Sequence, residues 1–314
     1  MEIINKYNNL KWNWIIISCN ILITMDIIDK YPNLPWDWYW ISLNQNLTID
    51  FIRKYPYKNW DWSNISRNSN ITINDIENNP DLPWILGFDC MSENPNLTLD
   101  FIKKYPDKDW IWSDISENPG ITMEDIENNP DLPWDWYDGV SGNPNLTIDF
   151  IKKHINKNWD WNYISCNSVI TMNIIENNPD LPWEYNSISD NPNLTIEFIK
   201  KYPYKNWNWF NISCNPAITL DIIENNIDLQ WNWDLISCNS NLTIEFIEKY
   251  SDKKWNWYEI AYNKNIIMKT FDPNKKYNKY EWTILSRSIF HIQFNNLIDI
   301  LNLPDDIKLN IKKY

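Results

Sequence analysis

Hydrophobic and polar residues recur along this chain in a fixed order, with a period close to 24 residues. Each repeat holds a Trp-x-Trp pair, an Ile-Ser-x-Asn segment, and a Thr that precedes a second apolar run. The first Trp recurs every 24 residues, except for steps of 26 after Trp84 and 25 after Trp134. These residues are Trp12, Trp36, Trp60, Trp84, Trp110, Trp134, Trp159, Trp183, Trp207, Trp231 and Trp255. The regularity indicates a repeat protein, with turns altered by small insertions around Gly87–Met91 and Tyr137–Val140.

A short helix is predicted at the apolar run after each Thr, and we call it the Thr-capped helix. A Thr hydroxyl at this position can accept a bond from the first turn of the helix. An Ile always follows four residues after the Thr and gives the helix an apolar face. We expect eight or nine residues, ended by Tyr-Pro or Asn-Pro. The Thr residues are Thr24, Thr48, Thr72, Thr98, Thr122, Thr147, Thr171, Thr195, Thr219 and Thr243.

A second short helix, the Trp-led helix, is predicted over the Trp-x-Trp-x-x-Ile-Ser segment. We expect about two turns, partly 3₁₀, from which both Trp side chains project, as at Trp134 and Trp136. An Asn ends this helix in eleven repeats, from Asn20 to Asn263. Asn tolerates the left-handed conformation that follows many helices. Stacked repeats would align these residues in an Asn ladder.

Neither helix is long enough to be stable alone in water, so each repeat must bury its apolar face against its neighbours. We therefore predict an all-α fold, an α-solenoid (superhelix) of about twelve 24-residue two-helix repeats. The repeats cover residues 1–288, with a partial first and a degenerate last repeat, and residues 289–314 form a helical C-terminal cap. A β-solenoid is the alternative, which two prolines per repeat disfavour.

The copy Met91–Ile102 (Met-Ser-Glu-Asn-Pro-Asn-Leu-Thr-Leu-Asp-Phe-Ile) resembles the variant leucine-rich repeat, a 24-residue α and 3₁₀ unit with an Asn-Pro turn. The chain departs from that family by placing Trp-x-Trp where the family has small aliphatic and Arg residues. With its bias towards Asn, Ile and Lys, the Trp-rich form resembles the repeat proteins of Mimivirus-type giant viruses. This resemblance implies a fold and a viral origin, and it implies no chemistry.

Successive repeats alternate in type, so the full period is 48 residues. One type continues with Ile-Lys-Lys-Tyr-Pro, as at Ile102–Pro106, and the other with Ile-Glu-Asn-Asn-Pro, as at Ile126–Pro130. We expect cross-layer ion pairs, because Lys103 and Lys104 lie one layer from Glu127 and Lys152 and Lys153 lie one layer from Glu176. Exposed pairs of this kind stabilise a fold by only about 0–1 kcal/mol each.

The net charge of −14 argues against nucleic acid and anionic membranes as partners. The charged N-terminal residues predict that no secretory signal is present, and no apolar run reaches the length of a membrane span. We therefore expect a protein that is not secreted, with reduced cysteines. The giant-virus resemblance implies a location in the host cytoplasm or the virion. The Asn-Leu-Thr sequons are interpreted as structural, and they begin at Asn46, Asn96, Asn145, Asn193 and Asn241.

No catalytic, cofactor-binding or metal-binding residue is predicted, and the protein is not expected to be an enzyme. The two histidines, His154 and His291, lie far apart in sequence, and His154 occupies the packing position of Tyr105 and Tyr202. Cys214 and Cys238 share one repeat position in adjacent layers, farther apart than a disulfide allows. No Cys/His cluster has the spacing of a zinc site.

A protein or peptide is therefore the expected partner. We expect it to bind at the positions whose residues vary between repeats. These are the two residues between the second Trp and Ile, and the residue before the turn Asn. The latter set is Cys19, Leu43, Arg67, Glu93, Glu117, Gly142, Cys166, Asp190, Cys214, Cys238 and Tyr262. Self-association through the poorly capped N-terminal edge is a further expectation.

The predicted function is a non-catalytic protein–protein interaction scaffold of giant-virus origin, acting in an infected host cell. The segment Leu303–Ile311 resembles the opening of an F-box, which poxviral ankyrin-repeat proteins carry in truncated form at the same end. That resemblance implies the alternative of a ubiquitin-ligase substrate adaptor. Only three residues follow Ile311, so a capping helix begun by Pro304 is the favoured interpretation. A structural virion or self-assembling protein is the remaining alternative.

Overall fold

The computed structural model describes residues 14–18, 23–263 and 266. The chain divides into two compact units, unit 1 (Met1–Val169) and unit 2 (Ile170–Tyr314). Every regular element among the described residues is a short helix and none is a strand. The all-α prediction is therefore confirmed for this part of the chain, where the β alternative is wrong.

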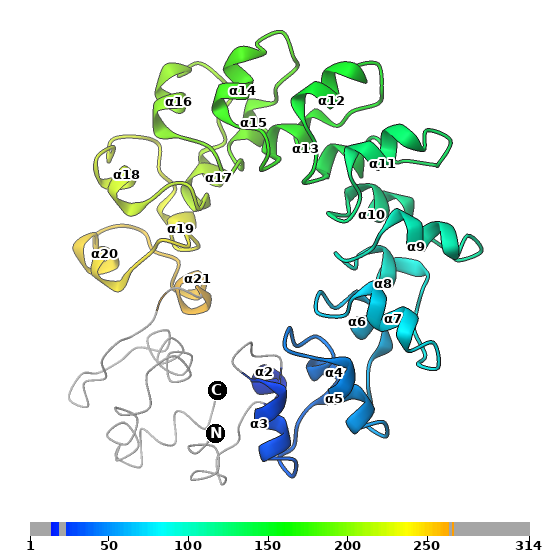
Figure 1. Cartoon of the computed structure of the whole chain (residues 1–314). Helices are drawn as coiled ribbons and strands as arrows, with labels where there is room; N and C mark the ends of the chain where they lie inside the picture. Colours follow the sequence, from blue (N-terminus) through cyan, green and yellow to red (C-terminus); the bar gives the residue numbers. More distant parts are fainter. Residues whose placement is uncertain (1–13, 19–22, 264–265, 267–314) are drawn as a thin grey trace, which may run out of the picture. The chain divides into compact units, whose positions relative to one another are not determined.

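The two kinds of helix alternate along each unit, and within a unit each kind lies along its own side (Figure 1). The Thr-capped helices of unit 1 are α3 (Met25–Lys30), α5 (Ile49–Lys54), α7 (Ile73–Asn78), α9 (Leu99–Lys104), α11 (Met123–Asn128) and α12 (Ile148–Lys153). Its Trp-led helices are α2 (Trp14–Ser18), α4 (Trp38–Ile41), α6 (Trp62–Arg67), α8 (Phe88–Ser92), α10 (Trp112–Glu117), η1 (Val140–Gly142) and α13 (Trp161–Cys166).

Unit 2 repeats the same alternation. Its Thr-capped helices are α14 (Met172–Asn177), α16 (Ile196–Lys201), α18 (Leu220–Glu224) and α20 (Ile244–Lys249). Its Trp-led helices are α15 (Tyr185–Ile188), α17 (Trp209–Cys214), α19 (Trp233–Ile236) and α21 (Trp257–Tyr262).

The Thr residues cap their helices as predicted. In α5, the Thr48 hydroxyl accepts a bond from the backbone N–H of Phe51 at 3.3 Å, and Thr122 forms a reciprocal capping box with Asp125. Thr24 is an exception, since its side chain makes no cap bond. These helices have five or six residues, not eight or nine. Where a Pro follows, the residue before it has already left the helical conformation, as at Tyr55 with φ −122° and ψ 55°.

The Trp-led helices differ from the prediction at both ends. Most begin at the second Trp, as α6 does at Trp62, with the residue between the two Trp as the N-cap, so the first Trp lies outside the helix. The exceptions are α8, η1 and α15, which begin at Phe88, Val140 and Tyr185. Asp61, for example, accepts a bond from the backbone N–H of Asn64 at 2.7 Å. The closing Asn is not left-handed, since Asn68 has φ −66° and ψ 126°. It holds the turn through its side chain, whose Oδ1 accepts from the N–H of Asn70 at 2.9 Å.

The same Asn side chains form the predicted ladder, which is buried. Asn118 donates through Nδ2 to the carbonyls of Ser92 at 2.7 Å and Asn94 at 2.9 Å, both in the preceding repeat. The sequon residue Asn96 also bonds the preceding repeat, at the carbonyl of Ser69. These bonds satisfy backbone groups that would otherwise be buried without partners. The ladder residues are Asn44, Asn68, Asn94, Asn118, Asn143 and Asn167 in unit 1 and Asn191, Asn215, Asn239 and Asn263 in unit 2.

Tryptophan and serine complete the contact between successive repeats. The second Trp of one repeat meets the first Trp of the next edge to face, as in Trp112 and Trp134 with ring centroids 5.2 Å apart. The Trp134 ring nitrogen donates to the carbonyl of Asn129 at 2.8 Å. The buried Ser116 hydroxyl accepts from the backbone N–H of Asp135 at 3.0 Å. This second ladder, of Ser, was not foreseen from the sequence.

At the two insertions, where altered turns were expected, the Trp-led helix itself differs, and α8 begins only at Phe88. In the repeat that begins at Trp134, the helix is reduced to the 3₁₀ turn η1. A Cβ on Gly139 would lie 2.4 Å from the Ser116 Cβ and 2.6 Å from the Ser113 carbonyl. Glycine is therefore required where the longer segment passes close to α10.

Several sequence predictions fall outside the described residues. They are the partial first repeat with its self-associating edge, Cys19, the degenerate last repeat, the cap at 289–314 with His291, and the F-box-like segment at 303–311. In the part of the chain that is described, no helix is both long and apolar enough to cross a membrane.

Candidate binding surface

The exposed edge of the Thr-capped helices carries ion pairs between successive repeats. Lys104 binds Glu77 at 2.6 Å and Lys153 binds Glu127 at 2.7 Å, with matching pairs in unit 2. Cross-layer pairing is thus confirmed, but its direction was wrong, because the second Lys reaches back to the preceding repeat. Lys153 and His154 hold the pKa of Glu127 below its usual value.

His154 packs as the sequence suggested. Its ring lies 4.5 Å from Phe150 and 5.4 Å from Trp136, centroid to centroid. Its Nε2 lies 3.3 Å from Glu127 Oε1. The tyrosines at this position behave alike, since the Tyr55 hydroxyl donates to Asp29 at 2.7 Å.

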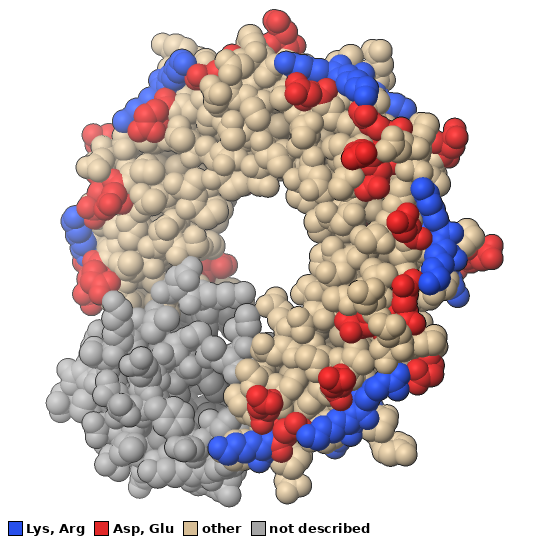
Figure 2. Space-filling view, in the orientation of Figure 1, with Lys and Arg blue, Asp and Glu red and all other residues tan. Residues whose placement is uncertain are grey.

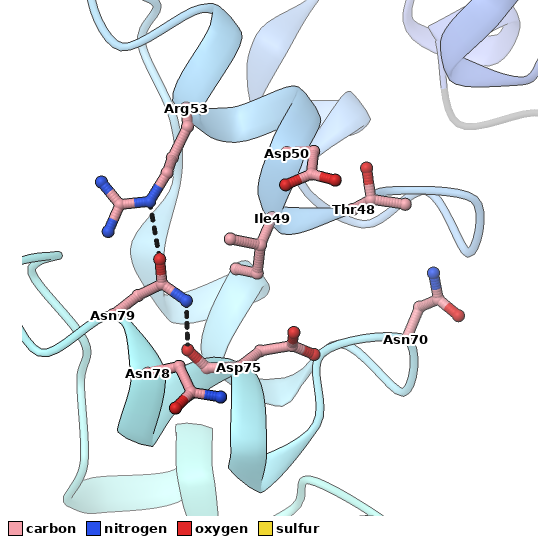
Figure 3. Close-up of a pocket in the computed structure, with 8 residues that line it drawn as sticks. All are labelled: Thr48, Ile49, Asp50, Arg53, Asn70, Asp75, Asn78 and Asn79. Atoms are coloured by element: carbon pink, nitrogen blue, oxygen red, sulfur yellow. Dashed lines mark hydrogen bonds between the residues drawn. The ribbon is translucent and has the colours of Figure 1, made fainter.

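A polar hollow of about 510 Å³ lies between α5 and α7 (Figure 3). Arg53 Nε donates to Asn79 Oδ1 at 2.6 Å, and its guanidinium pairs with Asp81 at 2.7 Å. Asp75 accepts from the Thr72 hydroxyl at 2.7 Å. The residues that line the hollow include no Ser, Cys or His, so it does not fit nucleophilic catalysis by those groups.

The variable positions lie instead on the Trp-led helices. We call these positions the Trp-led face and treat each unit separately. The described side chains of unit 1 there are Ile15, Tyr39, Trp40, Leu43, Ser63, Asn64, Arg67, Cys90, Glu93, Ser113, Asp114, Glu117, Tyr137, Asp138, Asn162, Tyr163 and Cys166, with Gly142. Those of unit 2 are Asn186, Ser187, Asp190, Phe210, Asn211, Cys214, Asp234, Leu235, Cys238, Tyr258 and Glu259.

Exposed aromatic rings stand on this face in both units. Tyr137 and Tyr163 are each 45% exposed in unit 1, and Phe210 and Tyr258 are each 59% exposed in unit 2. The tryptophans of the repeat contact differ, since Trp134 is only 7% exposed. Aromatic side chains at exposed positions are enriched where proteins bind one another.

The Trp-led face is acidic. Lys and Arg gather over the Thr-capped helices (Figure 2), and Arg67 is the one basic residue among the described positions of the Trp-led face. Arg67 is itself paired with Glu93, at 3.1 Å. The remaining carboxylates of the face are therefore not balanced by basic groups of the face.

The carboxylates of the face are partly desolvated. Burial, with the nearby charge of Asp114, raises the pKa of Glu117. In unit 2, burial raises the pKa of Asp190 despite a hydrogen bond from Asn211. Burial and then the charge of Glu259 raise the pKa of the Cys238 thiol to about 12. Such a thiol is protonated at neutral pH and is a poor nucleophile.

The structure thus brings the predicted variable positions of each unit onto one face. The sequence did not predict which of these side chains are most exposed to solvent. The exposed fraction of a side chain depends on how its helix packs against the neighbouring repeats, and the repeat pattern does not show this. Within the described part of the chain, Cys90, Cys214 and Cys238 are free thiols. Among the described residues, no three His, Cys, Asp or Glu side chains are grouped to hold a metal ion.

Comparisons with known proteins add no relative. The chain matches no protein-family model, no curated protein and no solved structure. The resemblances of its sequence to variant leucine-rich repeats and to giant-virus repeat proteins therefore remain predictions.

Proposed function

We propose that the repeats form an α-solenoid that acts as a non-catalytic scaffold and binds a protein or peptide on its Trp-led face. One observation carries the proposal. The Trp, Asn and Ser side chains that repeat contact the neighbouring repeat, whereas most of the described side chains that vary are wholly or partly exposed on the Trp-led helices of each unit. Helical repeat proteins use such variable faces to bind partners.

The register of the Asn and Ser ladders supports the solenoid. In each unit, these bonds run between adjacent repeats in the same way from one repeat to the next, as at Asn94, Asn118 and Asn143. Deleting residues 71–120 joins Asn70 to Ile121 in register. We expect the shortened chain to keep its helical circular dichroism per residue and to unfold cooperatively. Loss of the helical signal would contradict nearest-neighbour stacking.

Binding is tested with variants that differ only in where an exposed aromatic ring is removed. The chain with Tyr137→Ala and Tyr163→Ala loses two rings of the Trp-led face. The control, Tyr57→Ala, removes a ring that is 97% exposed in the loop after α5. We expect affinity purification with quantitative mass spectrometry to lose its specific partners with the first variant and to retain them with the control. Equal recovery with both variants would refute the assignment of the face.

The giant-virus origin and the host-cell setting remain proposals that rest on the sequence resemblance. The ubiquitin-ligase adaptor depends on residues outside the described part of the chain. Self-assembly through the N-terminal edge depends on residues outside it as well. No observation on the described residues favours either alternative over a scaffold.

A further inference from the structure

We propose that the polar hollow between α5 and α7 binds a polyhydroxylated ligand of the size of a monosaccharide or disaccharide. The hollow lies among the Thr-capped helices of unit 1 and shares no residue with the Trp-led face. The inference is therefore independent of the proposed function. It combines the volume of the hollow, the hydrogen-bonding groups of its walls and two substitutions that set this repeat apart.

The hollow has the size of a small-molecule site, but its lining does not suit an apolar molecule. Its volume of about 510 Å³ falls within the roughly 300–1,000 Å³ of such sites. Sites for apolar ligands are lined mainly by hydrophobic and aromatic side chains, whereas Ile49 is the one hydrophobic residue in this lining. The polar side chains come from α5 on one side and α7 on the other, with Asn70 on the loop before α7 (Figure 3). The lining therefore indicates a hydrophilic ligand.

One wall of the hollow is fixed by hydrogen bonds within the protein. Arg53 Nε donates to Asn79 Oδ1 at 2.6 Å, and the two terminal nitrogens of the same guanidinium donate to Asp81 at 2.7 and 3.2 Å. Asn79 in turn donates through Nδ2 to the backbone carbonyl of Asp75 at 2.7 Å. These bonds tie α5 to α7 and to the loop that follows α7. A wall that is already ordered loses less conformational entropy when a ligand binds.

The walls also hold acceptors that the protein leaves available. One oxygen of Asp75 accepts from the hydroxyl and the N–H of Thr72, and its other oxygen makes no hydrogen bond within the described part of the chain. Asn70 donates through Nδ2 to the Leu47 carbonyl at 2.8 Å, which leaves its side-chain oxygen as an acceptor. The exposed carboxylate of Asp50 adds two more acceptors.

Donors stand beside these acceptors. The Thr48 oxygen accepts the cap bond from the N–H of Phe51 at 3.3 Å, so its hydroxyl hydrogen can be donated to a ligand. The exposed Asn78 amide can both donate and accept. A hydroxyl group likewise donates and accepts, so neighbouring hydroxyls of a sugar match this mixture of groups.

Other classes of ligand fit the walls less well. A phosphate or carboxylate ligand would be repelled by Asp50 and Asp75, because the charge of Arg53 is already balanced by Asp81 at 2.7 Å. An ammonium ligand only donates, so it would leave the donors of the hollow without an acceptor. Among the residues that the structure describes, no three His, Cys, Asp or Glu side chains are grouped to hold a metal ion.

The equivalent position between α9 and α11 differs at two residues of the lining. Lys103 stands in place of Arg53, and Gly120 stands in place of Asn70. A Lys ammonium lacks the planar fork with which the guanidinium bonds two partners at once, and a glycine offers no side-chain oxygen. We therefore expect the hollow between α5 and α7 to bind the ligand and its counterpart between α9 and α11 to serve as a control within the same chain.

The test uses the full chain and saturation-transfer difference NMR with D-glucose, D-galactose, D-mannose and N-acetyl-D-glucosamine, each offered singly. We expect at least one of these sugars to bind with a Kd of about 1–10 mM, as suits a small ligand held by a few hydrogen bonds. Cyclohexanol, a ring of similar size with one hydroxyl, should bind at least about tenfold more weakly, because it loses most of those bonds. Binding of none of the sugars, or equal binding of cyclohexanol, would overturn the proposal.

Two variants and two matched controls locate the site. Asp50→Ala removes two acceptors and Asn78→Ala removes the exposed amide, and each should weaken binding of the sugar about three- to tenfold. Asp100→Ala and Asn128→Ala make the same changes at the equivalent positions of α9 and α11 and should change Kd less than twofold. Equal losses in the two pairs would contradict the assignment of the site.

Arg53→Lys tests the fixed wall, since it installs the residue type of the equivalent repeat. It should weaken binding at least about threefold, because Lys cannot bond Asn79 and Asp81 together; unchanged binding would contradict the role of the wall. Displacement of the sugar by an equal concentration of spermidine would indicate a site for cations and would also overturn the proposal. Circular dichroism verifies that each variant remains folded, so that a lost signal reports on the hollow.

Discussion

Aromatic and polar side chains are buried in the contact layer between repeats and exposed on the Trp-led face. In the contact layer, Trp134 is 7% exposed and donates through its ring nitrogen. On the Trp-led face, Tyr163 is 45% exposed. Asn118 is buried and bonds the preceding repeat, whereas the carboxyl of Glu117, one residue earlier, is left without a basic partner on the face.

The difference in burial between these two regions distinguishes structural residues from candidate binding residues in a repeat protein. A side chain that recurs in every repeat is constrained because each copy must bond its neighbours in the same way. A repeat position whose side chain varies is not under that constraint, so its side chain can contact a binding partner. This reasoning requires no comparison with a relative, because the repeats are compared with one another.

The largest effect is expected for a ring in the contact layer. Trp134→Ala should destabilise the fold by about 3–5 kcal/mol, because it removes a buried ring and its edge-to-face contact with Trp112. Tyr163→Ala should change the free energy of unfolding by less than about 0.5 kcal/mol. Urea unfolding followed by circular dichroism measures both. Similar losses for the two variants would abolish the distinction between the regions.

The Asn ladder gives the next largest effect. Asn118→Ala leaves the Gly120 N–H and two buried carbonyls without their partner, and should cost about 2–4 kcal/mol. Asn128→Ala changes an exposed residue at the end of α11 and serves as the control. The same urea titration compares them. An Asn118→Ala chain as stable as the control would show that the ladder does not hold the repeats together.

The pH dependence of stability should have opposite signs at two glutamates. The pKa of Glu127 is lowered by Lys153 and His154, so its contribution is present above the unfolded-state pKa and is lost as the pH falls through the lowered folded-state pKa. The pKa of Glu117 is raised by burial, so its contribution is present below the unfolded-state pKa and is lost as the pH rises through the raised value.

Glu127→Gln and Glu117→Gln isolate these contributions between about pH 3 and pH 7, the range in which carboxyl groups titrate. Relative to the unmodified chain, the first variant should lose stability as the pH rises, and the second should gain it. Thermal unfolding across this range measures the two trends. Trends of the same sign would show that both carboxyls have the same electrostatic environment.

The smallest effect is expected at the ion-paired edge. Lys153→Ala removes the 2.7 Å pair with Glu127, and Lys152→Ala removes the preceding, exposed Lys as a matched control. Both variants should shift the thermal midpoint by less than about 2 °C, because exposed pairs are screened by solvent. A much larger shift for Lys153→Ala would mean that the edge, and not only the contact layer, holds the repeats in register.

Features set by bonds within one repeat could be predicted well from the sequence. Most of the Thr caps, the end of a Thr-capped helix where Pro follows, as at Tyr55, and the alternation of helices all followed from local preferences. The errors arose where a neighbouring repeat competes for a group. The Ser116 hydroxyl accepts a hydrogen bond from the backbone N–H of Asp135 in the next repeat. This bond holds the backbone of Asp135 in place before the Trp-led segment begins. The prediction of which Glu pairs with each Lys was also wrong. The spacing in the sequence does not show whether a Lys side chain extends to the preceding or to the following repeat.

The sequence by itself determined the period, the helical class and the set of positions free to vary, because a repeat must carry its own caps and apolar face. Only the tertiary structure decided what those positions do. It buried the ladder Asn residues, whose side-chain amides donate hydrogen bonds to backbone carbonyls of the preceding repeat. It also left Tyr137, Tyr163 and Glu117 exposed on one face of unit 1. The physical reason is that burial and charge balance depend on which side chains stand opposite one another after the repeats have stacked.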